Sequence, residues 1–201
     1  MWKKSFIIAI SLLLICIMGC TYSLPTGDLP EDLPNTAPTE ADNSSSEESA
    51  ESDREAHTEL SFYLDNSDVQ RTASLHCGEN YSIYILDEGW SFSTQSSGDI
   101  TVDSWESTDN SMATLQVVSL GKMSLEDAKA WANEFGQGFE LSERKQGGYL
   151  GSDDGDKNLM EMDFVEVDGQ IIAIALKYPM EETEGLGTCI RVMADTFAVE
   201  K

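Results

Sequence analysis

Apolar and polar residues alternate along much of the chain beyond residue 60, a pattern typical of β-strands that bury one face. The run at residues 81–86, Tyr-Ser-Ile-Tyr-Ile-Leu, is rich in aromatic and β-branched residues, ends at Asp87-Glu88-Gly89 and resumes at residues 90–92. Further strands are predicted at residues 60–64, 69–75, 100–103 and 112–120. The domain is therefore expected to consist mainly of strands.

The clearest hairpin is predicted at residues 160–178. Two alternating runs, 160–167 and 170–178, are separated by Asp168-Gly169. These residue types readily adopt the positive φ angles that a two-residue type I′ turn requires. The second run is long and apolar, which predicts a central position in its sheet.

Two helices are predicted. Ser124 has the position of an N-cap and Asp127 that of a capping-box residue, while Gly136 is expected to end the helix in a left-handed conformation. One face of this helix carries the apolar residues Leu125, Ala128, Ala132 and Phe135. A second helix is expected near residues 186–197. The predicted fold class is α+β, an antiparallel β-sheet with a few helices packed on it, in one globular domain at residues 60–201.

The first 19 residues have the character of a secretory signal peptide. Lys3 and Lys4 precede a run at residues 6–18 that is apolar except for Ser11, and the small residue Gly19 follows. Such a run spans roughly 20 Å as a helix, which is short of the ~30 Å hydrocarbon core of a membrane. Export is therefore favoured over a permanent transmembrane helix.

The residues Ile17-Met18-Gly19-Cys20 resemble the lipobox of bacterial lipoproteins. Ile17 and Gly19 match that motif, whereas Met18 departs from its usual small or β-branched residue. The resemblance implies cleavage before Cys20, a diacylglyceryl group on its sulfur, and a lipid anchor in the extracytoplasmic face of the cell membrane. The alternative is an ordinary signal peptide cut nearby, with Cys20 free.

Residues 20–59 are expected to form a disordered acidic tether that starts at the lipidated Cys20. From Thr21 to Glu59 the chain has four of its five prolines, eleven acidic residues and one basic residue, Arg54. A segment with so few apolar groups cannot offset the entropy that ordering would cost. We expect the tether to hold the domain away from the membrane.

The net charge limits the partners of the protein. The chain has 12 basic and 37 acidic residues and a formal charge of −25; loss of Lys3 and Lys4 with the signal peptide would leave 10 basic residues and a charge of −27. Binding to nucleic acid requires a basic surface that neutralises phosphates. No nucleic-acid partner is therefore expected.

Several segments together resemble the PsbP-like fold, which includes the PsbP subunit of photosystem II and a small Ran-binding import factor. They are the turn at residues 87–90, the helix start at 123–128, the Asp168-Gly169 hairpin and the closing segment 193–197. The chain is more similar still to lipoproteins of Gram-positive bacteria with a YSIYI-x-x-x-GW start, here residues 81–90. The resemblance covers about residues 75–200. It implies a PsbP-like sandwich and a binding or assembly role, and it carries no functional residue to this chain.

Few residues suggest catalysis. The two histidines are His57, in the expected tether, and His76, at the edge of the domain. His76 and Cys77 could form a base and a nucleophile only if a turn brought them together, because neighbours on a strand point to opposite faces. No nucleophile elbow, phosphate loop or dinucleotide motif is present. We expect no catalytic residue, no metal site and no cofactor.

Three further groups of residues leave alternatives open. Alternating oxygen ligands at Asp154, Asp156 and Asn158 imitate the start of a calcium loop, but the glycine and glutamate that such a loop needs are missing. The tryptophans Trp90, Trp105 and Trp131 are expected in the core rather than along a ligand groove. Once Cys16 and Cys20 are assigned to the signal peptide and the anchor, Cys77 and Cys189 remain, either as a disulfide or as two free buried thiols.

These observations favour a non-enzymatic lipoprotein, anchored through Cys20, whose domain binds a protein or a small-molecule ligand at the membrane exterior. Two alternatives are a secreted hydrolase that uses paired carboxylates around an aromatic groove, and a weak calcium-binding module.

Overall fold

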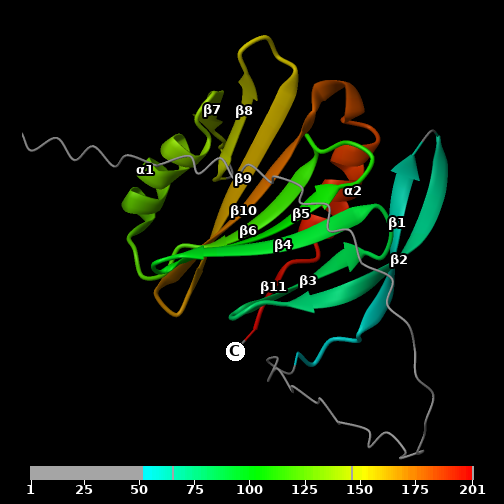
Figure 1. Cartoon of the computed structure of the whole chain (residues 1–201), viewed down its shortest axis with the longest axis horizontal. Coiled ribbons are helices and arrows are strands. Elements are labelled where there is room, and N and C mark those ends of the chain that lie inside the picture. The colour runs from blue at the N-terminus through cyan, green and yellow to red at the C-terminus, as the bar shows by residue number, and fades with distance from the viewer. Residues whose placement is uncertain (1–51, 65, 146, 201) are drawn as a thin grey trace, which may run out of the picture. The chain divides into compact units, whose positions relative to one another are not determined.

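The strands of the domain form two antiparallel sheets (Figure 1). The computed structural model describes residues 52–64, 66–145 and 147–200, which belong to one compact unit, Ser46–Lys201. The smaller sheet has the order β1 (His57–Leu64), β2 (Ser67–Cys77), β3 (Tyr81–Leu86) and β11 (Ala198–Val199). The larger has the order β4 (Trp90–Ser97), β5 (Ile100–Ser107), β6 (Thr114–Ser119), β10 (Gln170–Pro179), β9 (Asn158–Val167), β8 (Tyr149–Asp153) and β7 (Phe139–Glu143). The predicted α+β class is confirmed, with two sheets where one was expected.

The predicted central hairpin is the middle of the seven-stranded sheet. β9 and β10 pair in register through the turn at Asp168 and Gly169, whose φ angles of 50° and 76° suit a type I′ turn. β10 also pairs with β6, so it has a neighbour on both edges. Side chains alternate along a strand, and both faces of β10 are covered, which explains why nearly every residue of this strand is apolar and buried.

One face of the seven-stranded sheet is covered by helix α1 (Leu125–Phe135). As predicted, the Ser124 hydroxyl accepts a hydrogen bond from the Asp127 backbone N–H at 3.1 Å and caps the helix. Ala128 and Ala132 are fully buried against residues of the sheet that include Val118, Ala173 and Ala175. Leu125, expected on the same apolar face, is instead 48% exposed because it lies in the first turn, at the end of the contact.

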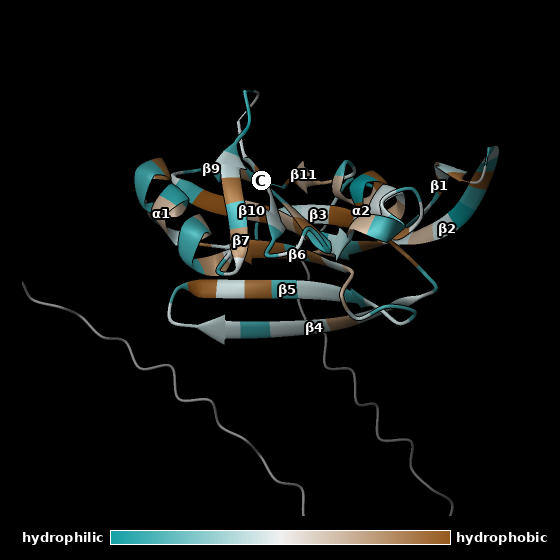
Figure 2. Cartoon of the chain, turned by 90° about the horizontal axis from the view of Figure 1, so that it is seen from above, coloured by the Kyte–Doolittle hydropathy of each residue, from teal (hydrophilic) through white to brown (hydrophobic). Residues whose placement is uncertain are grey.

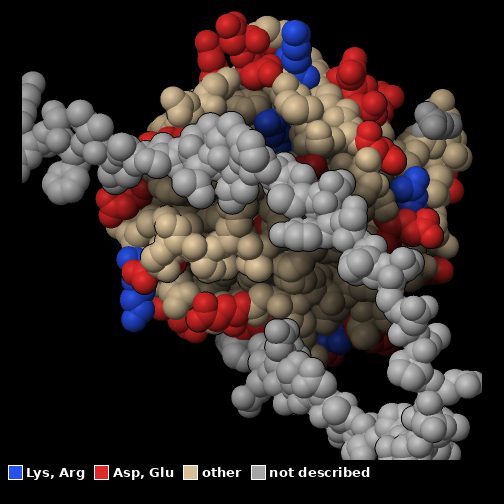
Figure 3. Space-filling model, viewed as in Figure 1, with Lys and Arg blue, Asp and Glu red and all other residues tan. Residues whose placement is uncertain are grey.

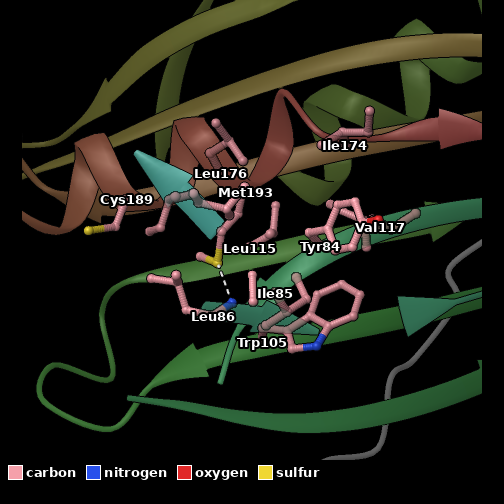
Figure 4. Close-up of a cluster of buried hydrophobic side chains, with 14 of the residues drawn as sticks. Tyr84, Ile85, Leu86, Trp105, Leu115, Val117, Ile174, Leu176, Cys189 and Met193 are labelled. Atoms are coloured by element: carbon pink, nitrogen blue, oxygen red, sulfur yellow. Dashed lines mark hydrogen bonds between the residues drawn. The ribbon is translucent and has the colours of Figure 1, made fainter. Parts of the chain in front are cut away.

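The other face is covered by the four-stranded sheet and helix α2 (Leu186–Ala194), with the 3₁₀ turn η1 (Met180–Glu182) before the helix. Figure 4 shows the side chains where the layers meet. Met193 lies between strands of both sheets, and its Sδ accepts a hydrogen bond from the Leu86 backbone N–H at 3.4 Å. Tyr84, Leu115 and Ile190 fill the same core cluster. The layers are therefore α1, the large sheet, and then the small sheet with α2.

The ends of both helices differ from the predictions. Gly136 was expected in the left-handed region, but its φ is −80° and the left-handed residue is Gly138, with φ 95°. The space at residue 136 is tight, because a Cβ there would lie 2.5 Å from Cδ1 of Leu141 and that side chain would have to shift. Helix α2 ends at Ala194, three residues earlier than expected, since the Thr196 hydroxyl bonds to the Met193 carbonyl at 2.6 Å.

The expected boundary at residue 60 is wrong, because β1 begins at His57. Residues before β1 also contact the domain: the Arg54 guanidinium donates to Ser82 Oγ at 2.8 Å and lies 4.3 Å from the centre of the Tyr84 ring. The Ser52 hydroxyl donates to Glu200 at 2.8 Å. The single base of the predicted tether thus contributes to the folded unit. The predicted signal peptide (1–19), Cys20 and the tether as far as residue 51 lie outside the described residues.

Candidate functional site

Both histidines of the chain lie on the same face of the four-stranded sheet. His57 on β1 is directly opposite Ser74 on β2, and His76 follows two residues later on β2, so the side chains share one face. The His76 ring contacts Phe92 of β4 and Trp105 of β5, with centroid distances of 4.7 Å and 4.9 Å. This face is therefore turned toward the first two strands of the larger sheet.

The first polar cluster on this face is centred on Asp103 of β5. Its Oδ2 accepts a hydrogen bond from the Tyr81 hydroxyl at 2.5 Å and lies 3.9 Å from Nε2 of His76. The Asp103 side chain is only 13% exposed. The Tyr81 ring reaches this position because it lies over Gly78, where a Cβ would be 2.0 Å from its Cε1. The cluster thus depends on the tight turn between β2 and β3.

The environment of this cluster fixes the protonation of two groups. Burial pushes the pKa of Asp103 upward, but the polar side chains of His76, Tyr81 and Thr94 around it outweigh burial and hold it below its usual value. Burial strongly raises the pKa of Tyr81, and its hydrogen bond to Asp103 raises it further. At neutral pH, Asp103 is therefore a carboxylate and Tyr81 a neutral donor, and the hydrogen bond between them joins the two sheets.

The second polar cluster joins His57, Ser74 and Asp87. The Ser74 hydroxyl donates to Asp87 Oδ1 at 2.6 Å and lies 3.0 Å from Nδ1 of His57. Since the single hydroxyl proton points to Asp87, the ring N–H of His57 must donate to the Ser74 oxygen. In a hydrolytic triad the serine donates to histidine and histidine to the carboxylate. The order found here therefore does not activate Ser74 as a nucleophile.

Next to this second cluster the surface has an open hollow of about 720 Å³. It lies between β2, the turn from β3 to β4, and the loop that follows β5. Its lining consists mostly of polar and charged side chains: Gln70, Arg71, Thr72, Asp87, Glu88, Thr108 and Asp109. Three carboxylates against one guanidinium suit a small ligand that is cationic or rich in hydrogen-bond donors. Sequence analysis had marked Asp87-Glu88-Gly89 only as a turn.

A third polar network, around Glu161 of β9, is built from side chains of the protein itself, and Nε of Arg144 is its one buried polar atom without a hydrogen-bond partner among the described residues. Glu161 accepts hydrogen bonds from Nε of Arg191 at 2.8 Å, from Nη1 of Arg144 at 3.4 Å and from the Tyr178 hydroxyl. The Arg191 guanidinium also lies 4.9 Å from the centre of the Tyr178 ring, and Arg144 bonds to Asp163. Because the carboxylates neutralise both arginines, this network is a structural lock rather than an anion site.

Cys77 and Cys189, the two cysteines among the described residues, form no disulfide with each other. His76 and Cys77 are consecutive in β2, where they oppose Ile83 and Ser82, so they point to opposite faces as a strand requires. Cys77 is half-buried and Cys189 is buried, and both are free cysteines. Burial raises the pKa of the Cys189 thiol. The sequence left a disulfide or two free thiols open for Cys77 and Cys189, and in this structure both thiols are free.

The loop that imitates a calcium site bonds to itself. The Asp153 carboxylate accepts hydrogen bonds from the backbone N–H groups of Lys157 and Asn158 at 2.8 Å and 2.9 Å, and from the Asn158 side chain at 2.6 Å. Asp156 accepts from the Ser152 hydroxyl at 2.5 Å. Within residues 52–64, 66–145 and 147–200, no group of three His, Cys, Asp or Glu side chains is placed to hold a metal ion. The geometry gives the calcium hypothesis no support.

The tryptophans belong mostly to the packing. Trp105 is 3% exposed in the core between the sheets, Trp90 packs against the same core, and Trp131 stacks on Phe135 with a centroid distance of 4.6 Å. The core interpretation is confirmed for Trp105. Trp90 is half-buried at the edge of the same core, and Trp131 is half-buried against the separate cluster under helix α1.

Charge is unevenly distributed over the surface. Figure 3 shows carboxylates gathered mainly around the rim of one face, with few charged side chains in the part of its middle that the picture leaves uncovered. Neither helix in the described part of the chain is long and apolar enough to cross a membrane.

Comparison with solved structures finds a similarity to cyanobacterial PsbP (CyanoP) from Synechocystis sp. PCC 6803, whose structure was solved in solution. The two chains are 12% identical, the TM-score is 0.43, and the match covers 63% of this chain and 92% of that one. A similarity of this extent transfers no residue, partner or activity. No protein-family model matches the chain, and no curated protein matches it.

Proposed function

We propose that this protein is a non-catalytic binding domain, held at the outer face of the cell membrane by lipid on Cys20. Its anchor is supported by the apolar run at residues 6–18 and by the lipobox-like residues Ile17-Met18-Gly19-Cys20. Two or more acyl chains on one cysteine give stable attachment, because each buried methylene contributes about 0.8 kcal/mol. The following acidic residues let the domain reach beyond the lipid surface.

One observation carries the binding role: the hollow of about 720 Å³ beside Asp87, with its hydrogen-bonding side chains. The ligand class is a small molecule that is cationic or rich in O–H and N–H donors. Such a ligand would meet Glu88, Thr108 and Asp109 from three different segments of the chain. Convergence of polar groups from separate segments is typical of ligand sites.

The chemistry around the hollow supports binding over hydrolysis. The Ser74 hydroxyl donates its proton to the Asp87 carboxylate and not to the His57 ring, so no base activates it as a nucleophile. Carboxyl-based hydrolysis needs an acid with a raised pKa opposite an ionised partner. The pKa values of the Asp103, Asp153 and Glu200 carboxyl groups are all lowered, which favours the ionised form and not a general acid.

The anchor is tested by metabolic labelling with a radioactive fatty acid. The Cys20→Ala variant should lose the label and accumulate as the uncleaved precursor, whereas Cys16→Ala, the matched control within the signal peptide, should be labelled and processed normally. Normal labelling and processing of Cys20→Ala would refute the anchor.

The hollow is tested by thermal unfolding of the full chain with spermidine, glucosamine or glucose as probes. A ligand that binds the folded state stabilises it by RT ln(1 + L/Kd), where L is the free ligand concentration, so Tm rises with the ligand concentration. Spermidine or glucosamine should raise Tm, and Asp109→Asn should reduce that rise, whereas Asp154→Asn, an exposed control on the loop between β8 and β9, should not. Equal effects of both substitutions, or no rise with any probe, would contradict the site.

A further inference from the structure

Strand β4 (Trp90–Ser97) is an open edge of the seven-stranded sheet. Among the residues that the structure describes it pairs only with β5, and seven of its eight residues are exposed. Figure 2 shows β4 at the margin of the domain beside β5, coloured mostly in the white and teal of weakly apolar and polar residues. An edge strand has a row of backbone N–H and C=O groups that no neighbouring strand takes up.

The turn between β4 and β5 shows which residues of β4 present those groups. Ser97 and Ile100 flank a two-residue turn in which Gly98 has a φ of 61°. In a hairpin of this kind the flanking residues form a hydrogen-bonded pair, and such pairs recur at every second residue. The backbone groups of the alternate residues therefore point away from β5: Trp90, Phe92, Thr94 and Ser96.

The other edges of the two sheets have the usual protection against pairing, and β4 has none. β7 carries Glu140 and Glu143, β1 carries Glu59, and β11 is only two residues long. β4, with the sequence Trp-Ser-Phe-Ser-Thr-Gln-Ser-Ser, has no charged residue and no proline. Natural proteins blunt their exposed edges with charges, prolines or short strands. An unprotected edge eight residues long is a surface for strand addition.

The charge around β4 indicates what kind of strand fits. Residues 72–121 include β4, the strand β3 before it and the strand β5 after it, and they contain no lysine and no arginine. They contain seven acids: Glu79, Asp87, Glu88, Asp99, Asp103, Glu106 and Asp109. A second copy of this chain would bring an equal set of carboxylates against these, which like-charge repulsion disfavours. A basic strand would be attracted.

We propose that β4 accepts an added β-strand from a basic polypeptide. Backbone hydrogen bonds to the outward groups of Phe92, Thr94 and Ser96 give the pairing. The exposed carboxylates beside β4, Asp99 in the turn after it and Glu106 opposite Ser91, favour lysine or arginine side chains on the added strand. Phe92 is 50% exposed beside His76 and offers an apolar contact to one side chain of the added strand. This surface depends neither on the lipid anchor nor on a ligand in the hollow.

The test uses the full chain in detergent with two labelled ten-residue peptides, one that alternates lysine with valine and threonine, and its counterpart with glutamate for lysine. Fluorescence anisotropy at low ionic strength should show at least about tenfold tighter binding of the lysine peptide, with affinity falling as salt is added. Hydrogen exchange should slow at Phe92, Thr94 and Ser96 when the lysine peptide is bound, and stay unchanged on β1 and β7.

Two substitutions at one position separate backbone pairing from charge. Ser96→Pro removes an outward N–H without changing the charge and should weaken binding about tenfold or more. Ser96→Thr keeps that donor and the hydroxyl that faces Thr101 Oγ1 at 3.1 Å, and it should bind like the wild type. Thermal unfolding shows whether each variant is folded. If Ser96→Pro does not fold, hydrogen exchange on the wild type with bound peptide still tests the proposal.

Each other outcome overturns the proposal. Wild-type affinity of a folded Ser96→Pro variant, binding without slower exchange at β4, or equal affinity for both peptides would exclude strand addition by a basic partner. Absence of lysine-peptide binding at millimolar concentration would do the same. If hydrogen exchange at β4 becomes slower as the protein concentration is increased without any peptide, the edge pairs with a second copy of this chain instead.

Discussion

The hydroxyl of Tyr81, on β3 of the small sheet, donates a hydrogen bond to the carboxylate of Asp103, on β5 of the large sheet. Tyr81 is 1% exposed, and its ring stacks on Phe197 with a centroid distance of 5.5 Å. The bond therefore lies at the interface of the two sheets, next to His76. A buried acceptor that loses a donor keeps the cost of its desolvation.

Removing the Tyr81 hydroxyl should destabilise the domain. Tyr81→Phe keeps the stacked ring and takes one donor away from Asp103, so we expect the free energy of unfolding to fall by about 1–2 kcal/mol. Urea denaturation measures this. Tyr63→Phe on β1, where the ring is 63% exposed, is the control and should leave stability unchanged. A Tyr81→Phe variant as stable as the wild type would show that the bond adds nothing.

The same carboxylate predicts how stability depends on pH. A folded-state pKa below the unfolded value gives stability that is present above the unfolded pKa, about 3.9 for aspartate, and is lost as pH falls through the folded pKa. Asp103→Asn should therefore be less stable than the wild type at neutral pH, and the difference should shrink as the pH falls below about 4. Urea titrations between pH 2.5 and 7 test this.

The many other acidic residues also make stability depend on pH, but the wild type and Asp103→Asn share them. The difference between their free energies of unfolding at each pH therefore reports on Asp103. A stability difference that stays constant across the acid range would show that the pKa of Asp103 is not lowered in the folded state.

Local signals predicted those parts of the fold that depend on neighbouring residues. Ser124 and Asp127 define a helix start within four residues, and Asp168-Gly169 defines a hairpin by its φ angles. The strands β7 and β8 were missed. For β8 the reason is Gly151, because glycine weakens a strand pattern. Its missing side chain lets β8 lie so close to β7 that a Cβ would be 2.3 Å from the Glu140 carbonyl oxygen.

The candidate site was harder to predict because it depends on pairings between distant residues. His57 was assigned to the tether from the acidic, proline-rich composition before it. The alternation in His57-Thr58-Glu59-Leu60-Ser61-Phe62 was the signal that could have extended the strand back to it. Nothing in the sequence joins Asp103 to Tyr81, or Ser74 to Asp87, since those contacts arise from the way the sheets fold over each other.

Glu161 offers a third test, because its 13% exposed side chain neutralises two arginines. Glu161→Gln keeps the shape and removes the charge, so it should lower the free energy of unfolding by about 1–3 kcal/mol, a range that allows for the partly exposed arginines. Lys129→Ala breaks the exposed ion pair with Glu143 at 2.9 Å and is the control, with little effect expected. Urea denaturation of both variants decides; equal effects would contradict the role of Glu161.

The two domain cysteines should differ in reactivity. The thiolate is the reacting form, and burial raises the pKa of Cys189 and shields it, whereas Cys77 is half-buried at the end of β2. In the native chain, iodoacetamide should therefore modify Cys77 much faster than Cys189, as followed by peptide mass spectrometry, which resolves each cysteine. In urea the two should react at similar rates. If neither reacts in urea until a reductant is added, the two are joined by a disulfide, and the free-thiol state of this structure is contradicted.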